Sequence, residues 1–399
     1  MTNIAIYTLT SELHDEQAET SRTRMFLDAI GVEHELKGAD YADYGTHALD
    51  VILVRTGGTE GLFKRLLPQL QRQGGGRPVY LLASHTSNSL AASMEILSYL
   101  RQQGLNGEII HGSNDYVRHR LLMLEQVGEA LCQLRGSRLG IIGQPSDWLI
   151  ASKADRAALA RRLGIELVDV EMGELMKVLE TTPETMPEEE SACECVKQAL
   201  PGAQRIYGAL KTVVEQQRLD GFTLRCFDLL TAVKNTGCLA LARLNAEGIV
   251  AGCEGDVPAM LSMKIVQALT GVSGFQANPS SIDPEAGEIL FAHCTIPLNM
   301  VERYEFDTHF ESGMGVGIRG YMKKGPVTVF KVAGDLSRFF VAEGVLMENL
   351  SKPSLCRTQQ VIRLNDKAAS SYFLTNPIGN HHIIVPGHWA EQLSFLLKQ

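Results

Sequence analysis

The chain has 399 residues, of which 45% are hydrophobic and 21% charged, and its formal net charge is −9. This is the composition of an ordinary soluble globular protein, long enough for two or three domains. The dispersed negative charge argues against nucleic acid as the main partner and provides no basic patch for a membrane surface. Because no apolar run reaches the ~18 residues of a spanning helix and the N-terminus has no positive leader, we expect a cytoplasmic protein.

Residues 1–134 alternate between apolar strand patterns and helical patterns, and are expected to form a first domain. Strands are predicted at 3–8, 32–36, 50–55 and 78–83, and helices at 16–30, 62–72, 89–103 and 115–134. The run at 50–55 is almost continuously apolar, as in a parallel strand buried on both faces. Alternation of this kind predicts a doubly wound parallel sheet with helices on its two faces.

A second α/β domain is predicted over residues 135–297, where the same alternation restarts. Strands are predicted at 137–143, 165–170, 221–227, 248–252 and 288–296, and helices at 153–163, 173–179, 194–219, 237–247 and from 260 onward. We expect another doubly wound sheet, closed by the strand at 288–296.

The pattern changes after Pro297, and residues 298–399 are predicted to be a third domain. Helical periodicity gives way to short alternating segments, followed by one final helix at 388–397. Evenly spaced short strands of this kind indicate an antiparallel sheet or barrel.

Two carboxylates follow predicted strands of the second domain. Asp228 and Glu254 lie 26 residues apart, and parallel strands joined by a crossover helix would bring both to one sheet edge. Oxygen ligands at that edge suit Mn²⁺ or Mg²⁺. The alternative is that each carboxylate caps the helix that follows it. We assign that capping role to Asp256, which lies further from its strand.

Histidines and polar loops provide further candidates. His381 and His382 are adjacent on a predicted strand, so only one of them can face a given site, and a hydrogen-bonded surface pair is the alternative. His293 lies within an apolar strand, in the core or at the rim. The glycine-rich turn at 56–61 suits an anion, a polyol or simply a tight turn, and the polar loop 84–88 suits ligand hydroxyls.

Several of these motifs together resemble the L-fucose/L-arabinose isomerase family. They are Cys226-Phe-Asp228, Cys253-Glu-Gly-Asp256, Ala292-His-Cys294 and Gly379-Asn-His-His382. The resemblance implies two doubly wound α/β domains followed by a C-terminal antiparallel β-barrel. It also implies an enzyme that interconverts an aldose and its ketose with Mn²⁺ or another divalent cation.

The resemblance also implies a set of site residues. Asp228, Glu254 and His381 would hold the metal, and the two carboxylates would act as acid and base through an ene-diolate. Substrate contacts would come from His85, Asn88, His293 and His382. Because such sites are completed by a neighbouring subunit, a homotrimer or homohexamer is expected.

Residues 275–278 lack a histidine that arabinose isomerases use near the metal, so by this resemblance the chain looks more like the fucose branch or an uncharacterised side branch of the family. The missing histidine also keeps open a non-catalytic sugar-binding or regulatory protein on the same scaffold. A nucleotide- or phosphate-binding protein using the 56–61 turn is a third hypothesis.

Overall fold

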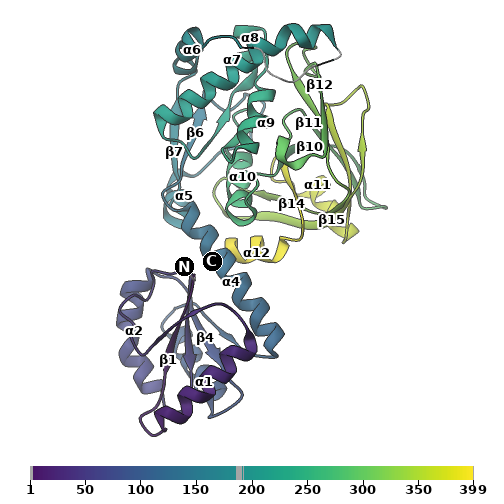
Figure 1. Cartoon of the computed structure of the whole chain (residues 1–399). Coiled ribbons are helices and arrows are strands. Elements are labelled where there is room, and N and C mark those ends of the chain that lie inside the picture. The colour runs from purple at the N-terminus through teal and green to yellow at the C-terminus, as the bar shows by residue number, and fades with distance from the viewer. Residues whose placement is uncertain (1–2, 186–190, 192, 399) are drawn as a thin grey trace. The chain divides into compact units, whose positions relative to one another are not determined.

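A computed structural model describes residues 3–185, 191 and 193–398 (Figure 1). The chain forms two compact units, one of residues up to 132 and one from 133 to 398. The two regions expected as second and third domains therefore pack together as one unit. None of the described helices combines the length and the apolar character needed to cross a membrane.

The first unit contains a five-stranded parallel sheet with the order β2-β1-β3-β4-β5, which confirms the predicted α/β class. Its elements are β1 (Ile4–Leu9), α1 (Glu16–Ile30), β2 (Glu35–Gly38), β3 (Leu49–Val54), α2 (Glu60–Gly74), β4 (Val79–Ala83), α3 (Ser89–Gln102), β5 (Gly107–Ile110) and α4 (Asn114–Leu134). Every residue of β1, β3 and β4 is buried, because helices cover both faces of the sheet. The short edge strand β5 was not predicted.

The second unit begins with a four-stranded parallel sheet in the order β7-β6-β8-β9. Its elements are β6 (Arg138–Ile142), α5 (Arg156–Leu163), β7 (Glu166–Val170), α6 (Met172–Thr181), α7 (Glu194–Gln217), β8 (Gly221–Leu224), α8 (Cys226–Val233), α9 (Cys238–Ala246), β9 (Val250–Cys253) and α10 (Val257–Thr270). Strands β8 and β9 are neighbours, and their last residues, Leu224 and Cys253, lie opposite each other. The carboxyl ends of both strands therefore lie at one sheet edge, as predicted.

An antiparallel barrel closes in the order β10-β11-β16-β15-β14-β17, which confirms the predicted barrel. Its strands are β10 (Phe275–Asp283), β11 (Glu288–His293), β14 (Gly325–Val332), β15 (Phe339–Leu350), β16 (Thr358–Leu364) and β17 (His382–Pro386). The remaining elements of this part are the hairpin β12 (Arg303–Asp307) and β13 (Gly317–Tyr321), two 3₁₀ turns (Leu298–Met300 and Lys367–Ser370), α11 (Ser371–Thr375) and α12 (Ala390–Lys398).

The expectation that the strand at 288–296 closes the second parallel sheet is wrong. This strand, β11, pairs antiparallel with β10 and β16 inside the barrel. The barrel therefore begins with β10, ahead of residue 298.

Helix α10 joins the parallel sheet to the barrel. Ten of its residues are buried, and it packs on β8 and β9 as well as on β14 and β17. A helix that is apolar on all sides must be enclosed, and here the sheet and the barrel enclose it. The turn that precedes α10 consequently lies where the parallel sheet meets the barrel (Figure 1).

Candidate metal centre

The turn between β9 and α10 has an unusual backbone. Glu254 and Gly255 both adopt left-handed conformations, with φ of 63° and 70°. A non-glycine residue in this region costs about 1 kcal/mol, and such strain collects at functional sites. At Gly255 a Cβ atom would approach the carbonyl oxygen of Gln144 to 2.7 Å. The turn is thus held tightly against the loop that follows β6, and Glu254 carries the strain.

Hydrogen bonds fix the position of this turn. The amide of Gly255 donates to the carbonyl oxygen of Leu224 at the end of β8 (2.9 Å), and the Ser146 amide donates to that of Glu254 (3.0 Å). The indole Nε1 of Trp148 donates to Glu254 Oε2 (2.7 Å). One carboxylate oxygen is therefore engaged by the β6–α5 loop, which leaves Oε1 directed at the barrel.

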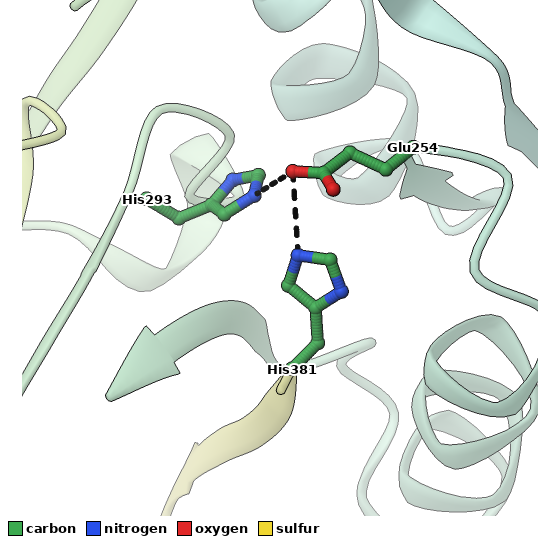
Figure 2. Close-up of side chains that lie close together, drawn as sticks. All are labelled: Glu254, His293 and His381. Carbon is green, nitrogen blue, oxygen red and sulfur yellow. Dashed lines mark ion pairs between the residues drawn. The ribbon is translucent and has the colours of Figure 1, made fainter. Parts of the chain in front are cut away.

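Three side chains from distant parts of the sequence converge around Oε1 (Figure 2). Glu254 Oε1 lies 3.7 Å from Nε2 of His293 and 3.5 Å from Nε2 of His381. Each residue offers one ligand atom, and these atoms all lie within 4.8 Å of one another. His293 ends β11, and His381 directly precedes β17. The carboxylate comes from the parallel sheet and both imidazoles come from the barrel.

The charged and titratable members of the group shift one another's pKa values. Burial alone would raise the pKa of Glu254, but the two histidines hold that pKa well below its usual range. Burial lowers the pKa of His293, which keeps its imidazole neutral near pH 7. Burial also opposes protonation of His381, yet Asp256 and Glu254 together raise its pKa to about 9. Glu254 is therefore ionised, and His381 would have to release a proton in order to bind a metal ion.

Both histidines are oriented through their second ring nitrogen. His381 Nδ1 lies 2.8 Å from Oδ2 of Asp256, and His293 Nδ1 lies 2.9 Å from Oγ1 of Thr295. Metal-binding histidines usually have such a partner, because it fixes the ring and its tautomer. Asp256 also accepts the Ala259 amide at the start of α10 (2.8 Å), which confirms the predicted cap.

The residues fit a divalent transition-metal ion. His381 Nε2 is buried and, among the residues that the structure describes, has the ion pair with Glu254 at 3.5 Å but no hydrogen bond. A buried polar atom of this kind is costly unless a ligand satisfies it. Two imidazoles and one carboxylate form a donor set for divalent transition metals rather than for Mg²⁺, and leave further coordination positions for a substrate.

A cleft lies beside this group. It is lined by Glu254, His293, His309, Glu311, Asn278, Phe227, Leu230, Thr236, Gly237, Cys226, Cys238, Cys253, Cys294 and Cys356. All eight cysteines of the chain are free thiols, as expected. The metal-binding groups of Glu254 and His293 therefore border this cleft.

The structure brings together only some of the residues expected in the site. Glu254 and His381 meet as expected, and His293, expected as a substrate contact, joins them as a candidate metal ligand. Asp228 does not meet Glu254. The chain enters helix α8 at Cys226, so Asp228 lies in the first turn of that helix, half-exposed and paired with Nε of Arg225 at 2.8 Å.

The other expected substrate contacts are His382, His85 and Asn88, which are not among the ligand atoms of this group. His382 is buried, with Nε2 3.1 Å from the hydroxyl of Tyr372 and Nδ1 3.0 Å from the carbonyl oxygen of Asn380. His85 and Asn88 belong to the first unit, where His85 Nε2 lies 3.1 Å from the carbonyl oxygen of Gly112.

Comparison with known proteins finds no matching family model. The chain is 28% identical over 227 residues to a sulfoquinovose isomerase of Clostridium sp. (strain MSTE9), which covers 54% of this chain and 49% of that protein. It is 23% identical over 261 residues to the sulfoquinovose isomerase of Alkalicoccus urumqiensis (61% and 59%), and 24% over 262 residues to that of Priestia aryabhattai (62% and 59%). The chain spans about half to three-fifths of the length of these curated relatives. Its similarity is thus to proteins named as isomerases, under a name other than fucose or arabinose isomerase.

Proposed function

We propose that the chain acts as an aldose–ketose isomerase that depends on a divalent metal, Mn²⁺ or another transition-metal ion. The observation that carries the proposal is the group of Glu254, His293 and His381 beside a cleft that Glu254 and His293 help to line. The similarity to proteins named sulfoquinovose isomerase supports the same reaction class.

The chemistry of such an isomerisation matches this group. A proton moves between C1 and C2 of the sugar, and negative charge develops on the oxygens of an ene-diolate. A bound divalent ion supplies Lewis-acid stabilisation of that charge. Glu254, His293 and His381 would hold the ion, while the Asp256 carboxylate keeps the His381 ring in position. The apolar side chains of Phe227 and Leu230 provide a wall for the C–H face of a sugar.

The proton carrier is proposed to be Glu311. The resemblance assigns this role to Asp228 or Glu254, but Asp228 pairs with Arg225 and does not line the cleft. Glu311, in the loop between β12 and β13, is the second carboxylate that lines it. Burial and the neighbouring charge of Glu254 raise the pKa of Glu311, which suits a group that must both take up and return a proton.

Replacing Glu311 by Gln should lower kcat about 10²- to 10⁴-fold, the usual contribution of general acid–base catalysis. The matched control is Asp228→Asn, which also removes one carboxylate from the same unit. It should keep kcat within about threefold, because neither Asp228 nor its partner Arg225 lines the cleft. Turnover and solvent deuterium exchange at C1 and C2 measure both effects, and metal content should stay unchanged. If Asp228→Asn is the inactive variant instead, the role implied by the family resemblance holds.

A panel of aldoses and ketoses tests the function as a whole. The protein loaded with Mn²⁺ should convert at least one sugar and incorporate solvent deuterium at C1 or C2, and a chelator should stop both. Sugar binding without conversion or exchange would identify a non-catalytic binding protein and would refute the proposal. A homotrimer or homohexamer stays a prediction, which sedimentation of the full chain checks.

A further inference from the structure

Thiols are concentrated in the cleft beside the metal group. Five of the eight cysteines of the chain line it, namely Cys226, Cys238, Cys253, Cys294 and Cys356. They come both from the α/β part of the second unit and from the segments around the barrel strands. Thiols that share a cleft within reach of a small oxidant form a candidate site of reversible oxidation.

Two of these thiols are in direct contact. Sγ of Cys253 donates to Sγ of Cys226 at 3.2 Å. Their backbones are close because Leu224, two residues before Cys226, lies opposite Cys253 in the neighbouring strands β8 and β9. Cys226 is partly buried, whereas Cys253 is only 4% exposed. A small oxidant that enters the cleft therefore meets Cys226 first, and Cys253 lies where it can react with the product.

We propose that Cys226 and Cys253 form a reversible disulfide in the presence of hydrogen peroxide, and that this disulfide weakens the metal centre. The effect on the metal and on turnover rests on the proposed function, but formation of the disulfide does not.

The oxidation proceeds in two steps. The thiolate of Cys226 attacks one oxygen of the peroxide, the O–O bond breaks, and Cys226 becomes a sulfenic acid while hydroxide leaves. Sγ of Cys253 then attacks Sγ of Cys226, the S–O bond breaks, and the sulfenic oxygen leaves as water. In total the two thiols lose two electrons and two protons, and the peroxide is reduced to two molecules of water. A dithiol reductant reverses the reaction by thiol–disulfide exchange.

The backbone of Cys253 is held in place from the barrel side. Its amide donates to Oε1 of Gln276 in β10 (2.9 Å), and Nε2 of the same Gln276 donates to its carbonyl oxygen (3.3 Å). A disulfide bond is shorter than the present contact between the two sulfur atoms, so one of the two residues must move. Because Cys253 is fixed, the movement falls mainly on Cys226 at the start of α8.

A movement of Cys226 reaches Glu254 through two aromatic side chains. Phe227 directly follows Cys226 and packs edge to face against Trp148, with ring centroids 4.9 Å apart. Trp148 in turn donates from Nε1 to Oε2 of Glu254 (2.7 Å). A partner that orients a metal ligand typically contributes 10- to 100-fold in affinity, on the order of what a displaced Trp148 should cost. Oxidation should therefore lower the affinity for the metal ion.

The experiment treats the full chain, loaded with Mn²⁺, with one equivalent of hydrogen peroxide and digests it with trypsin without a reducing agent. Trypsin cleaves after lysine and arginine, so Cys226 lies in the peptide 226–234 and Cys253 in the peptide 244–264, each as the only cysteine. Mass spectrometry should find these two peptides linked, with the loss of two hydrogen atoms, and dithiothreitol should separate them. The Kd for Mn²⁺ should rise at least about tenfold in the oxidised protein and recover with dithiothreitol.

Two outcomes would overturn the inference. One is oxidation of other cysteines without the link between 226–234 and 244–264, and the other is a linked protein whose affinity for Mn²⁺ is unchanged. A reduced protein that converts no sugar would refute the isomerase function, while the linked peptides and the Mn²⁺ titration would still decide the inference.

Two alanine variants, each compared with its own reduced form, identify the thiol that reacts. In Cys226→Ala the Kd for Mn²⁺ should change by less than about twofold on oxidation, because the remaining Cys253 is buried and a buried thiol reacts poorly. Cys356→Ala is the matched control, because it removes another thiol from the lining of the same cleft and should respond to peroxide as the unaltered chain does. If Cys226→Ala still loses affinity for Mn²⁺ as the unaltered chain does, a different thiol carries the effect and the inference is wrong.

Discussion

Replacing Glu254 by Gln should abolish metal binding and turnover while leaving the fold intact. The amide keeps the size of the side chain and its bond from Trp148, but removes the charge that two buried histidines now face. We expect bound metal to fall from one ion per chain to almost none, and kcat to fall at least about 10³-fold, as when a main stabiliser of developing charge is lost. Elemental analysis after dialysis, turnover with Mn²⁺ and circular dichroism measure the three quantities.

The matched control for this variant is Glu288→Gln. Glu288 begins β11, the strand that His293 ends, and pairs with Arg363 at the protein surface. Its loss should change metal content and kcat by less than about twofold, because surface ion pairs contribute little. A Glu254→Gln protein that still holds one divalent ion per chain would refute the assignment of the metal centre.

The sequence predicted the part of the site that depends on residues next to one another in the chain. An apolar run followed by Cys253-Glu-Gly-Asp256 and a helical pattern predicted a strand end, a turn and a capped helix, and the structure confirms all three. Gly255 was a further local sign, because a glycine directly after an acidic residue permits the left-handed turn that aims Glu254.

Asp228 was misplaced because the apolar segment before it fits two structures. Residues 221–227 are consistent with one strand, but the strand ends at Leu224 and the apolar residues that follow form α8. A short apolar run fits a strand as well as a buried helix. The residue at which the strand ends therefore follows from the lengths of the neighbouring strands and not from the run itself.

Long-range pairing explains what else was missed. His293 became a candidate ligand only because β11 belongs to the barrel and not to the parallel sheet. Asp256 and His381 are 125 residues apart, and nothing local indicates that they touch. Glu311 lies in a hairpin loop with no motif around it, so its place in the cleft follows from the fold alone.

Replacing Asp256 by Asn should separate the two tasks of this buried carboxylate. Asp256 accepts the Ala259 amide, holds Nδ1 of His381 and lies 3.5 Å from Nζ of Lys331, which is buried in β14. Asparagine caps helices as well as aspartate does, so the helix should remain. The free energy of unfolding should nevertheless fall by about 3–5 kcal/mol, because the charge of Lys331 is left buried without its counterion. Metal affinity should fall about 10- to 100-fold, since His381 loses the carboxylate that orients it.

The double variant Asp256→Asn with Lys331→Met shows which effect belongs to which contact. Methionine removes the buried charge while keeping an unbranched side chain among the barrel residues, so most of the lost unfolding free energy should return. Metal affinity should stay low, because the His381 ring still lacks its carboxylate. Chemical denaturation and metal titration are measured for Asp256→Asn, for the double variant and for Lys331→Met alone. Together they separate the effect on the free energy of unfolding from the effect on metal affinity. If the double variant also regained wild-type metal affinity, Asp256 would support the site through its pairing with Lys331 and not through the orientation of His381.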